Sequence, residues 1–334
     1  MSREINRWKK TVSPEGLFDK IRSSCRRVSE NADYVRINVD QIKEYADSLP
    51  LEKIKTSSLD PGCHYLGRGE GPLAFFLILD SINFGSGYFP LLKKRSGMSG
   101  YFTIASALNE YFINNGPMDC RILGGLSPAD CARLFGQDSE NETVGELMEL
   151  FAKAMNDLGE YVTLQFGGSF SNMVNAAENS CEKFIAILSG MPLFRDVQFY
   201  KGLDVHFFKR AQLTCADLAL AFQGDGPGKF YDLRRLTIFA DNLVPHVLRM
   251  DGVLRYVPEL LRKIDGGELI PRDSCEEIEI RACALHAVEL VRNALRETGK
   301  NATSMGLDYL LWNRGQNPFY KKTKPRHRTR TVFY

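Results

Sequence analysis

The chain has 334 residues, of which 44% are hydrophobic and 25% are charged, and its formal net charge is +2. This composition is ordinary for a globular protein with a sizeable core, and the length does not decide between one domain and two. The near-neutral charge argues against an extended duplex-binding face, although it leaves room for a small phosphate pocket.

Neither a secretory leader nor a membrane span is indicated by the sequence. Met1 to Glu4 lead into charged residues, and no apolar run approaches the ~18 residues that a spanning helix needs. The eight cysteines form no Cys-x-x-Cys pair, and Cys63 and His64 are adjacent, which is a poor geometry for two ligands of one metal. We therefore expect a cytoplasmic protein with free thiols, no metal and no cofactor.

Helical patterns dominate the chain in order. Ser13 and Pro14 are typical of a helix start, as N-cap and first helical residue. Further helices are predicted near 40–48, 72–84, 101–115, 128–135, 142–158, 170–188, 208–222, 236–249, 258–264, 275–296 and 303–312. Only 194–208 alternates in the manner of a short β-hairpin, with its turn at Gly202. We expect an all-α fold with at most this hairpin, as a single body over 1–334 with a basic tail at 321–334.

The helix predicted at 72–84 is apolar nearly all round, which is typical of a buried helix. It carries Asp80 and Asn83, which are three residues apart and therefore on one face. These polar groups either bridge neighbouring helices or contact a ligand. The loop at 56–71 holds His64 and alternating glycines, but no strand precedes them, so a dinucleotide-binding motif is not indicated.

The segment 236–249 is predicted to be an apolar helix with Asp241 in its middle and Pro245 four residues later. Because proline has no N–H for the carbonyl of residue i−4, the helix should kink at Asp241 and expose its carboxylate. A charge in apolar surroundings is costly unless it is paired or used. Asp241 is therefore either one half of a buried salt bridge to an arginine or a functional carboxylate.

Six motifs follow one another along the chain: LDSINF (79–84), GGSF (167–170), FKRAQL (208–213), FADNLVPHVLR (239–249), EIRACALHAVELV (279–291) and LDYLLW (307–312). With the ending HRTRTVFY, they make the sequence resemble the queuosine salvage proteins, which act as queuosine 5′-phosphate N-glycosylases. The resemblance implies an α-helical fold similar to that of DNA glycosylases. It also implies hydrolysis of queuosine 5′-phosphate to ribose 5-phosphate and queuine, which a separate transglycosylase can reinsert into tRNA.

The resemblance also implies roles for single residues. Asp241 of the F-A-D motif is the expected catalytic aspartate, and the expected pocket residues are His64, Phe239, Asp308, Tyr309 and Asn313, the last at a position that is often acidic in relatives. A carboxylate close to C1′ either stabilises the oxocarbenium-like transition state or attacks C1′. Asp80 and Asn83 suit the base and its cationic amine. Without the resemblance, His64 would be interpreted as a surface residue of a loop. Asp308 would be interpreted as a partner of the helix dipole, and Tyr309 as an aromatic residue of the core.

Lys209 is predicted to read the 5′-phosphate of such a substrate. It stands where a helix begins, and the free N–H groups and dipole of a first helical turn favour an anion. Gln212 lies on the same face and can donate a hydrogen bond, whereas Arg210 points roughly 100° away and suits a structural role. The basic tail at 321–330 is interpreted as a solvated charge run, with packing on the body or phosphate contact as alternatives.

Two other functions remain open from the residues. A DNA base-excision glycosylase would need a basic surface and a glycine-rich helix–hairpin–helix, for which 224–228 is the one candidate. A non-catalytic protein that binds queuine or modified tRNA would keep the pocket without needing Asp241. We expect a small nucleotide substrate, no stable nucleic-acid partner and no membrane association.

Overall fold

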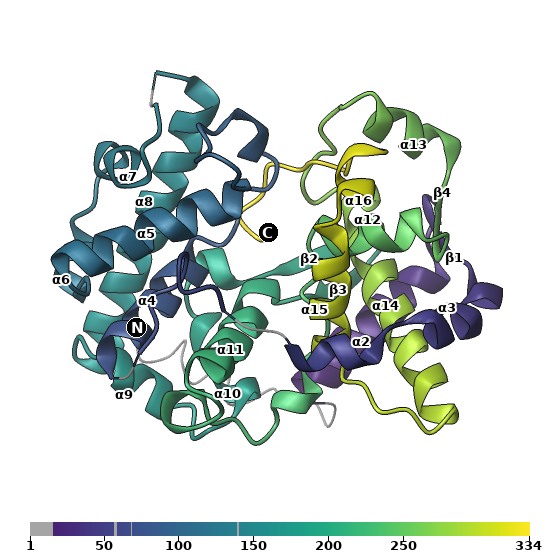
Figure 1. The fold of residues 1–334 in the computed structure, drawn as a ribbon, viewed down its shortest axis with the longest axis horizontal. Helices are drawn as coiled ribbons and strands as arrows, with labels where there is room; N and C mark the ends of the chain where they lie inside the picture. Colours follow the sequence, from purple (N-terminus) through teal and green to yellow (C-terminus); the bar gives the residue numbers. More distant parts are fainter. Residues whose placement is uncertain (1–15, 57–58, 68, 139) are drawn as a thin grey trace.

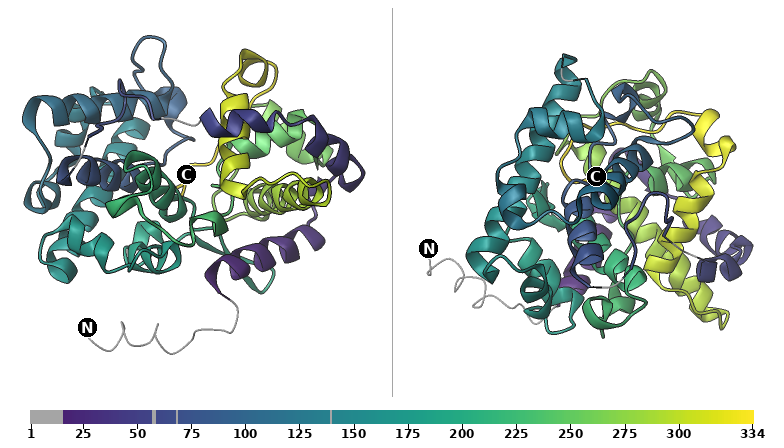
Figure 2. Two further views of the ribbon diagram at one scale, coloured as in Figure 1. Left: turned by 60° about the horizontal axis from the view of Figure 1, so that its bottom comes forward. Right: turned by 60° about the vertical axis from the view of Figure 1, so that its left-hand side comes forward.

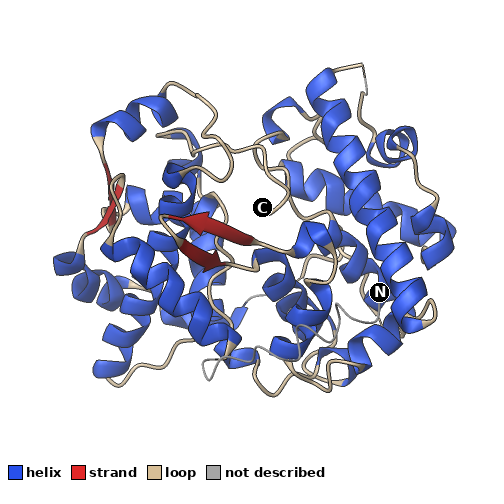
Figure 3. Cartoon of the chain, turned by 180° about the vertical axis from the view of Figure 1, so that it is seen from behind, coloured by secondary structure: helices blue, strands red, loops and turns tan. Residues whose placement is uncertain are grey.

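The computed structural model describes residues 16–56, 59–67, 69–138 and 140–334. These fold into helices joined by loops, with two small antiparallel sheets (Figures 1 and 3), which confirms the all-α prediction. The predicted helix start at Ser13 and Pro14 lies outside the described residues. The helix itself is α2 (Leu17–Glu30), with Gly16 at its N-cap. Within the described residues, no helix is long and apolar enough to cross a membrane.

The two sheets contain two strands each. The predicted hairpin is confirmed as β2 (Val197–Tyr200) paired with β3 (Leu203–His206). A second antiparallel pair joins β1 (Val35–Ile37) to β4 (Leu254–Tyr256), so the expectation of at most one hairpin is wrong. This pair was missed because its strands are short and lie far apart in the sequence.

One lobe of the molecule is built around α4 (Glu70–Ser81), which is buried along nearly its whole length. Around it lie α5 (Gly100–Asn115), α6 (Cys120–Gly124), α7 (Pro128–Phe135), α8 (Glu142–Phe166) and α9 (Phe170–Asn175). The single helix predicted at 170–188 is wrong, because Glu178 and Asn179 have φ of 51° and 59°. Ser180 then caps a separate helix, α10 (Cys181–Leu188).

The other lobe surrounds α14 (Cys275–Glu297), of which most residues are buried. Its other helices are α2, α3 (Ile42–Ser48), α12 (Leu243–Met250), α13 (Pro258–Asp265), α15 (Ser304–Gly315) and α16 (Pro318–Lys322). Between the lobes, α11 (Lys209–Ala221) packs on α4 and α10. Short 3-10 helices occur at η1 (Val39–Gln41), η2 (Leu51–Thr56), η3 (Phe89–Leu91), η4 (Pro192–Phe194), η5 (Gly226–Gly228) and η6 (Leu233–Arg235). One continuous hydrophobic core joins both lobes.

The segment 236–241 is not helical, so the kinked helix predicted around Asp241 is wrong. This segment contains no helical residue, and α12 begins only at Leu243. Pro245 stands in the first turn of α12, where its missing N–H leaves no helical hydrogen bond unmade. The Asp241 carboxylate instead accepts hydrogen bonds from the backbone N–H groups of Leu243 and Val244 at 2.8 and 3.0 Å. Asp241 therefore stands at the start of a helix and anchors its first turn.

The end of the chain, residues 323–334, forms a strap between the two lobes (Figures 1 and 2). On one side, the Ile270 N–H donates to the Arg328 carbonyl at 2.8 Å, and on the other the Gly85 N–H donates to the Tyr334 backbone oxygen at 3.0 Å. A Cβ on Gly87 would lie 2.3 Å from the Thr329 carbonyl oxygen, so the strap needs glycine there. The interpretation of the tail as a solvated charge run is therefore wrong for this strap.

Candidate active site

A cavity of about 720 Å³ lies between the two lobes, within the size range of small-molecule sites. It is lined by α5, α11, α15, the segment around Asp241, the loop after α4 and the strap. The predicted residues that line it are His64, Asn83, Lys209, Phe239, Asp241, Asp308, Tyr309 and Asn313. The fold thus brings together side chains that are up to 249 positions apart in the sequence, from 64 to 313.

Side chains of two helices fix the backbone of the extended segment 236–241. From α11, the Gln212 amide oxygen accepts the Thr237 N–H at 2.9 Å, and its Nε2 donates to the Thr237 hydroxyl at 2.9 Å. From α15, the Asp308 carboxylate accepts the Phe239 N–H at 2.9 Å. These hydrogen bonds satisfy buried backbone groups of the segment, which in a β-strand would be satisfied by a neighbouring strand. Asp241 is therefore held in place from both α11 and α15.

Arg281 of α14 completes this support. Its Nε donates to the Ala240 carbonyl at 3.0 Å, and its two terminal nitrogens bind both carboxylate oxygens of Asp196 at 3.0 and 2.6 Å. The guanidinium is fully buried and stacks on the Phe207 ring at 4.0 Å. The same Asp196 accepts the Lys209 N–H at 3.1 Å, so one ion pair ties the Asp241 segment to the start of α11.

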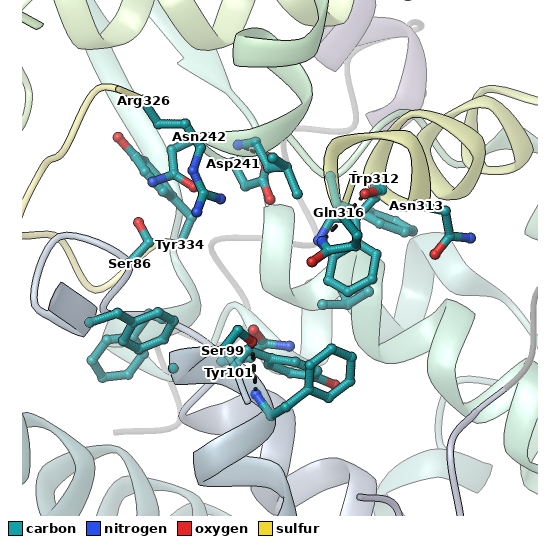
Figure 4. A pocket seen from close by; sticks show the side chains of 18 of the residues that line it. Ser86, Ser99, Tyr101, Asp241, Asn242, Trp312, Asn313, Gln316, Arg326 and Tyr334 are labelled. Carbon is teal, nitrogen blue, oxygen red and sulfur yellow. Dashed lines mark hydrogen bonds between the residues drawn. The ribbon is translucent and has the colours of Figure 1, made fainter. Parts of the chain in front are cut away.

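Asp241 presents a free carboxylate oxygen to the cavity. Its Oδ1 accepts the two N–H groups at the start of α12, whereas Oδ2 forms no hydrogen bond with any described residue. Figure 4 shows the side chain at the cavity wall between Asn242 and Gln316. Since the two hydrogen bonds fix the position of the carboxylate, the group is preorganised to face a developing positive charge.

Three further carboxyl groups, Asp80, Asp217 and Asp308, form an acidic floor. Burial raises the pKa of Asp308 well above its usual range, and the Asp241 charge adds to that effect. Burial likewise raises the pKa of Asp217, with the Asp80 charge as the second cause. Burial raises the pKa of Asp80 to about 7, although hydrogen bonding to Asn83 opposes the shift. Burial thus favours the protonated form of all three carboxyl groups.

Asp80 does not line the cavity, so its predicted contact with the substrate is corrected. It is fully buried, one carboxylate oxygen has no partner among the described residues, and its charge raises the pKa of Asp217. Asn83 lies beyond the end of α4, which stops at Ser81, and therefore lines the cavity from a loop. Among the described residues, no group of three or more His, Cys, Asp or Glu side chains is placed to hold a metal ion.

Lys209 begins α11 as predicted, but the helix start does not offer the predicted anion site. Its backbone N–H is taken by Asp196, and the Gln212 amide is used on Thr237 and the Phe207 carbonyl. The buried Lys209 ammonium instead lies 3.5 Å from the Asn83 carbonyl. Burial lowers its pKa, which the charges of neighbouring aspartates, Asp241 first, oppose. Lys209 therefore acts as the cation of the acidic floor.

His64 is buried rather than exposed on its loop. Its Nε2 lies 3.1 Å from the Tyr101 hydroxyl, and its Nδ1 lies 3.0 Å from the Asp60 backbone nitrogen. The imidazole stacks on Phe76 with ring centroids 6.0 Å apart. Burial lowers the pKa of His64, so the ring is neutral near pH 7. A neutral imidazole paired with a tyrosine hydroxyl suits recognition of a polar, uncharged edge of a ligand.

Aromatic rings form the wall of the cavity beside Asp241. Phe239 and Tyr309 meet edge to face with ring centroids 6.1 Å apart, and Trp312 meets Phe102 in the same way at 6.1 Å. The Tyr309 hydroxyl is buried and has no partner among the described residues. Buried hydroxyls without a partner are rare and point to a missing ligand or water. Asn313 is exposed at the rim of the cavity.

Sequence reasoning missed Asp217, Tyr101 and Arg326, all of which line the cavity. One signal was available for Asp217, because it lies eight residues after Lys209 and so falls on the same face of α11. No local pattern marks Arg326, which only the path of the strap brings to the cavity.

Comparison with known proteins agrees with this site. The family model described as "Queuosine salvage protein" matches residues 63–334. A protein of Sphaerobacter thermophilus named queuosine 5′-phosphate N-glycosylase/hydrolase is 34% identical over 317 residues, which cover 93% of this chain and 97% of that protein. Proteins of the same name from Dictyostelium discoideum and Mus musculus are 32% and 30% identical, each covering 94% of this chain and 98% of its own length. The chain therefore belongs to the queuosine salvage protein family.

Proposed function

We propose that this protein hydrolyses the N-glycosidic bond of queuosine 5′-phosphate and releases queuine and ribose 5-phosphate. The observation that carries the proposal is the Asp241 carboxylate, which is held by two backbone N–H groups and leaves one oxygen free in the cavity. The names of the relatives, all queuosine 5′-phosphate N-glycosylase/hydrolase, supply the substrate.

Asp241 faces the sugar in this proposal. As the bond from C1′ to the base breaks, positive charge develops on C1′ and the ring oxygen, and a fixed carboxylate stabilises that charge. In the direct route, water adds to C1′ as the base leaves and passes its proton to solvent or to the Asp241 carboxylate. In the covalent route, Asp241 bonds to C1′ as the base leaves, and water then displaces the carboxylate from C1′ and releases its proton to solvent. Both routes need the free carboxylate oxygen that the hydrogen bonds at the start of α12 leave available.

The acidic floor acts on the base. The leaving 7-deazapurine takes the bonding electron pair and needs a proton, and it has carbon where a purine has N7. Asp217 and Asp308 line the cavity, and burial raises the pKa of both carboxyl groups. Each can therefore donate a hydrogen bond or a proton to the base, while His64 and Tyr309 bind its remaining polar edge. The Lys209 ammonium opposes the effect of burial, because its charge lowers the pKa of Asp80, Asp217 and Asp308.

Further features support a free nucleotide as the substrate and the cytoplasm as the location. The net charge of +2 offers little attraction for a nucleic acid. The glycine-rich candidate for DNA binding at 224–228 contains η5, where a Cβ on Gly228 would lie 2.4 Å from the Leu218 carbonyl oxygen, so packing explains that glycine. All eight cysteines are free, which suits a reducing compartment. We also propose that both lobes act as one domain, since the cavity needs both.

The decisive experiment is to incubate the purified protein with queuosine 5′-phosphate and to follow free queuine by chromatography. Release at a rate proportional to enzyme concentration supports the proposal. Parallel samples contain queuosine-modified tRNA and a set of damaged-base DNA duplexes. Base release from DNA alone would favour a DNA glycosylase. Saturable binding of queuine without any release from the nucleotide would favour a non-catalytic binding protein.

A further inference from the structure

The strap carries a guanidinium that no other described residue uses. Arg326 lines the cavity and forms no hydrogen bond or ion pair with any residue that the structure describes. Its neighbours on the strap are engaged: Arg328 donates to the Gly267 carbonyl, and Arg330 donates to the Thr143 hydroxyl at 3.2 Å. A partly buried arginine without a partner is costly, and five free N–H donors in a planar fork suit an oxyanion.

Arg326 stands on the Asp241 side of the cavity. Figure 4 shows its side chain next to Asn242, with Ser86 and Tyr334 on the same side. Burial lowers the pKa of Arg326 and the Asp241 charge opposes this shift, so the two groups act on each other across the site. A sugar whose C1′ faces Asp241 can therefore present its opposite end, the 5′ carbon, to Arg326.

Ser86 offers a second donor at the same place. Its hydroxyl is buried and has no partner among the described residues, and the side chain lines the cavity. The strap holds this region in place, because the Tyr334 backbone oxygen accepts the N–H of Gly85 at 3.0 Å and that of Ser86 at 3.5 Å. Two unpartnered donors on one side of the cavity, one charged and one neutral, fit the oxygens of a phosphate group.

Lys209 is less suited to that role. Its ammonium lies among Asp241, Asp80 and Asp308, which already counter its charge, and its start-of-helix N–H is taken by Asp196. The strap side of the cavity instead offers the Arg326 guanidinium, and Lys321 also lines the cavity.

We infer that Arg326, with Ser86, forms a subsite for a phosphomonoester, and that the strap exists at this site to hold it. The subsite deepens the proposed function and rests on it for the identity of the nucleotide. It assigns selection of the 5′-phosphorylated substrate over the unphosphorylated nucleoside to the strap and not to the start of α11.

The test compares kcat/KM for queuosine 5′-phosphate and for queuosine in wild type and in Arg326→Gln. Loss of one charge-assisted hydrogen bond is expected to lower the ratio of the two kcat/KM values by about 10- to 100-fold. The matched control is Arg330→Gln, on the same strap but outside the cavity, and its ratio should stay at the wild-type value. Equal losses on both substrates in Arg326→Gln, or an equal change in the control, would overturn the inference.

Two further measurements keep the result interpretable. Ser86→Ala should lower the same ratio by a few-fold, and it serves if Arg326→Gln fails to give a wild-type circular dichroism spectrum. Calorimetric titration with ribose 5-phosphate should show saturable binding to wild type that Arg326→Gln weakens at least 10-fold. If wild type hydrolyses neither queuosine 5′-phosphate nor queuosine, the proposed function fails. The titration with ribose 5-phosphate still tests whether Arg326 binds a phosphomonoester. Equal affinity of wild type and Arg326→Gln for ribose 5-phosphate would overturn the inferred subsite.

Discussion

Two sets of buried charges lie on either side of the Asp241 segment, and they differ in how well they are paired. On one side, the Arg281 guanidinium uses its donors on the Ala240 carbonyl and on both oxygens of Asp196. On the other side, the acidic floor keeps an Asp80 oxygen and the nearby Tyr309 hydroxyl without partners among the described residues. A paired buried charge supports the fold, whereas unpaired polar atoms beside a cavity point to a ligand.

The largest expected effect comes from breaking the paired set. Arg281→Met leaves the buried Asp196 carboxylate without its cation, and we expect the free energy of unfolding to fall by about 3–5 kcal/mol. Urea denaturation followed by circular dichroism measures this change. Arg281→Met combined with Asp196→Leu should recover part of the loss, because the Asp196 carboxylate is then removed as well, and only the more distant Glu277, 3.9 Å from Arg281, loses its cation. A single variant as stable as wild type would show that the ion pair is not the support we describe.

The next effect concerns Asp241, the residue on which both sets converge. Asp241→Asn keeps an oxygen that can accept the two N–H groups of α12 but removes the negative charge that faces C1′. We expect kcat for queuosine 5′-phosphate to fall by at least ~10²-fold, with ligand binding retained. Asp225→Asn, an exposed position after α11, is the matched control. Turnover of Asp241→Asn close to the wild-type rate would remove Asp241 from the mechanism.

Much of this arrangement was predictable from the sequence, and the limits have physical causes. Local signals placed α5, α7 and α14 well, because caps and apolar periodicity act within a few residues. The segment 236–241 was predicted to be helical because its residues are apolar, and the signal that the helix starts only after Asp241 was overlooked. An aspartate followed by a proline in the next turn, as in Asp241 and Pro245, is typical of a helix start. This signal predicts a helix that begins after Asp241 and not at residue 236.

Other parts of the site could not be found from local patterns. The Arg281 and Asp196 side chains are 85 positions apart, so only the fold reveals that they pair. Arg326 looked like one charge in a basic tail, because nothing in the residues around it indicates that the strap crosses to the other lobe. The roles of His64 and Asp308 came from the family resemblance and not from their spacing, and they stay predictions.

A smaller effect is expected for Lys209, which belongs to the unpaired set. Lys209→Met removes the cation of the acidic floor. We expect kcat/KM to fall by the equivalent of about 1.5–3 kcal/mol, the usual scale for a hydrogen bond to a charged group. Because the ammonium lies on the floor and not on the strap side, kcat/KM should fall to a similar extent for queuosine 5′-phosphate and queuosine. A loss confined to the phosphorylated substrate would instead restore Lys209 as the phosphate ligand.

The last effect is a change in how stability depends on pH, and it arises from Asp80. Burial raises the pKa of Asp80 in the folded protein to about 7, above its ordinary value of 3.8. Between these two values the folded state holds a proton that the unfolded state has released, so stability falls as pH rises, and above about pH 7 this contribution levels off. One such group contributes at most ~1.4 kcal/mol per pH unit.

Asp80→Asn removes this titration while keeping the shape of the side chain. Relative to wild type, the variant should therefore gain stability as the pH is raised from 5 to 7, because only wild type loses stability from this group. His246 and His327, whose pKa values are lowered by burial, act in the opposite direction, but they do so equally in both proteins and cancel in the difference. Melting temperatures at half-unit pH steps measure the difference, with Asp225→Asn as the control. Parallel curves for wild type and Asp80→Asn would mean that Asp80 stays ionised in the folded protein and is not a protonated member of the acidic floor.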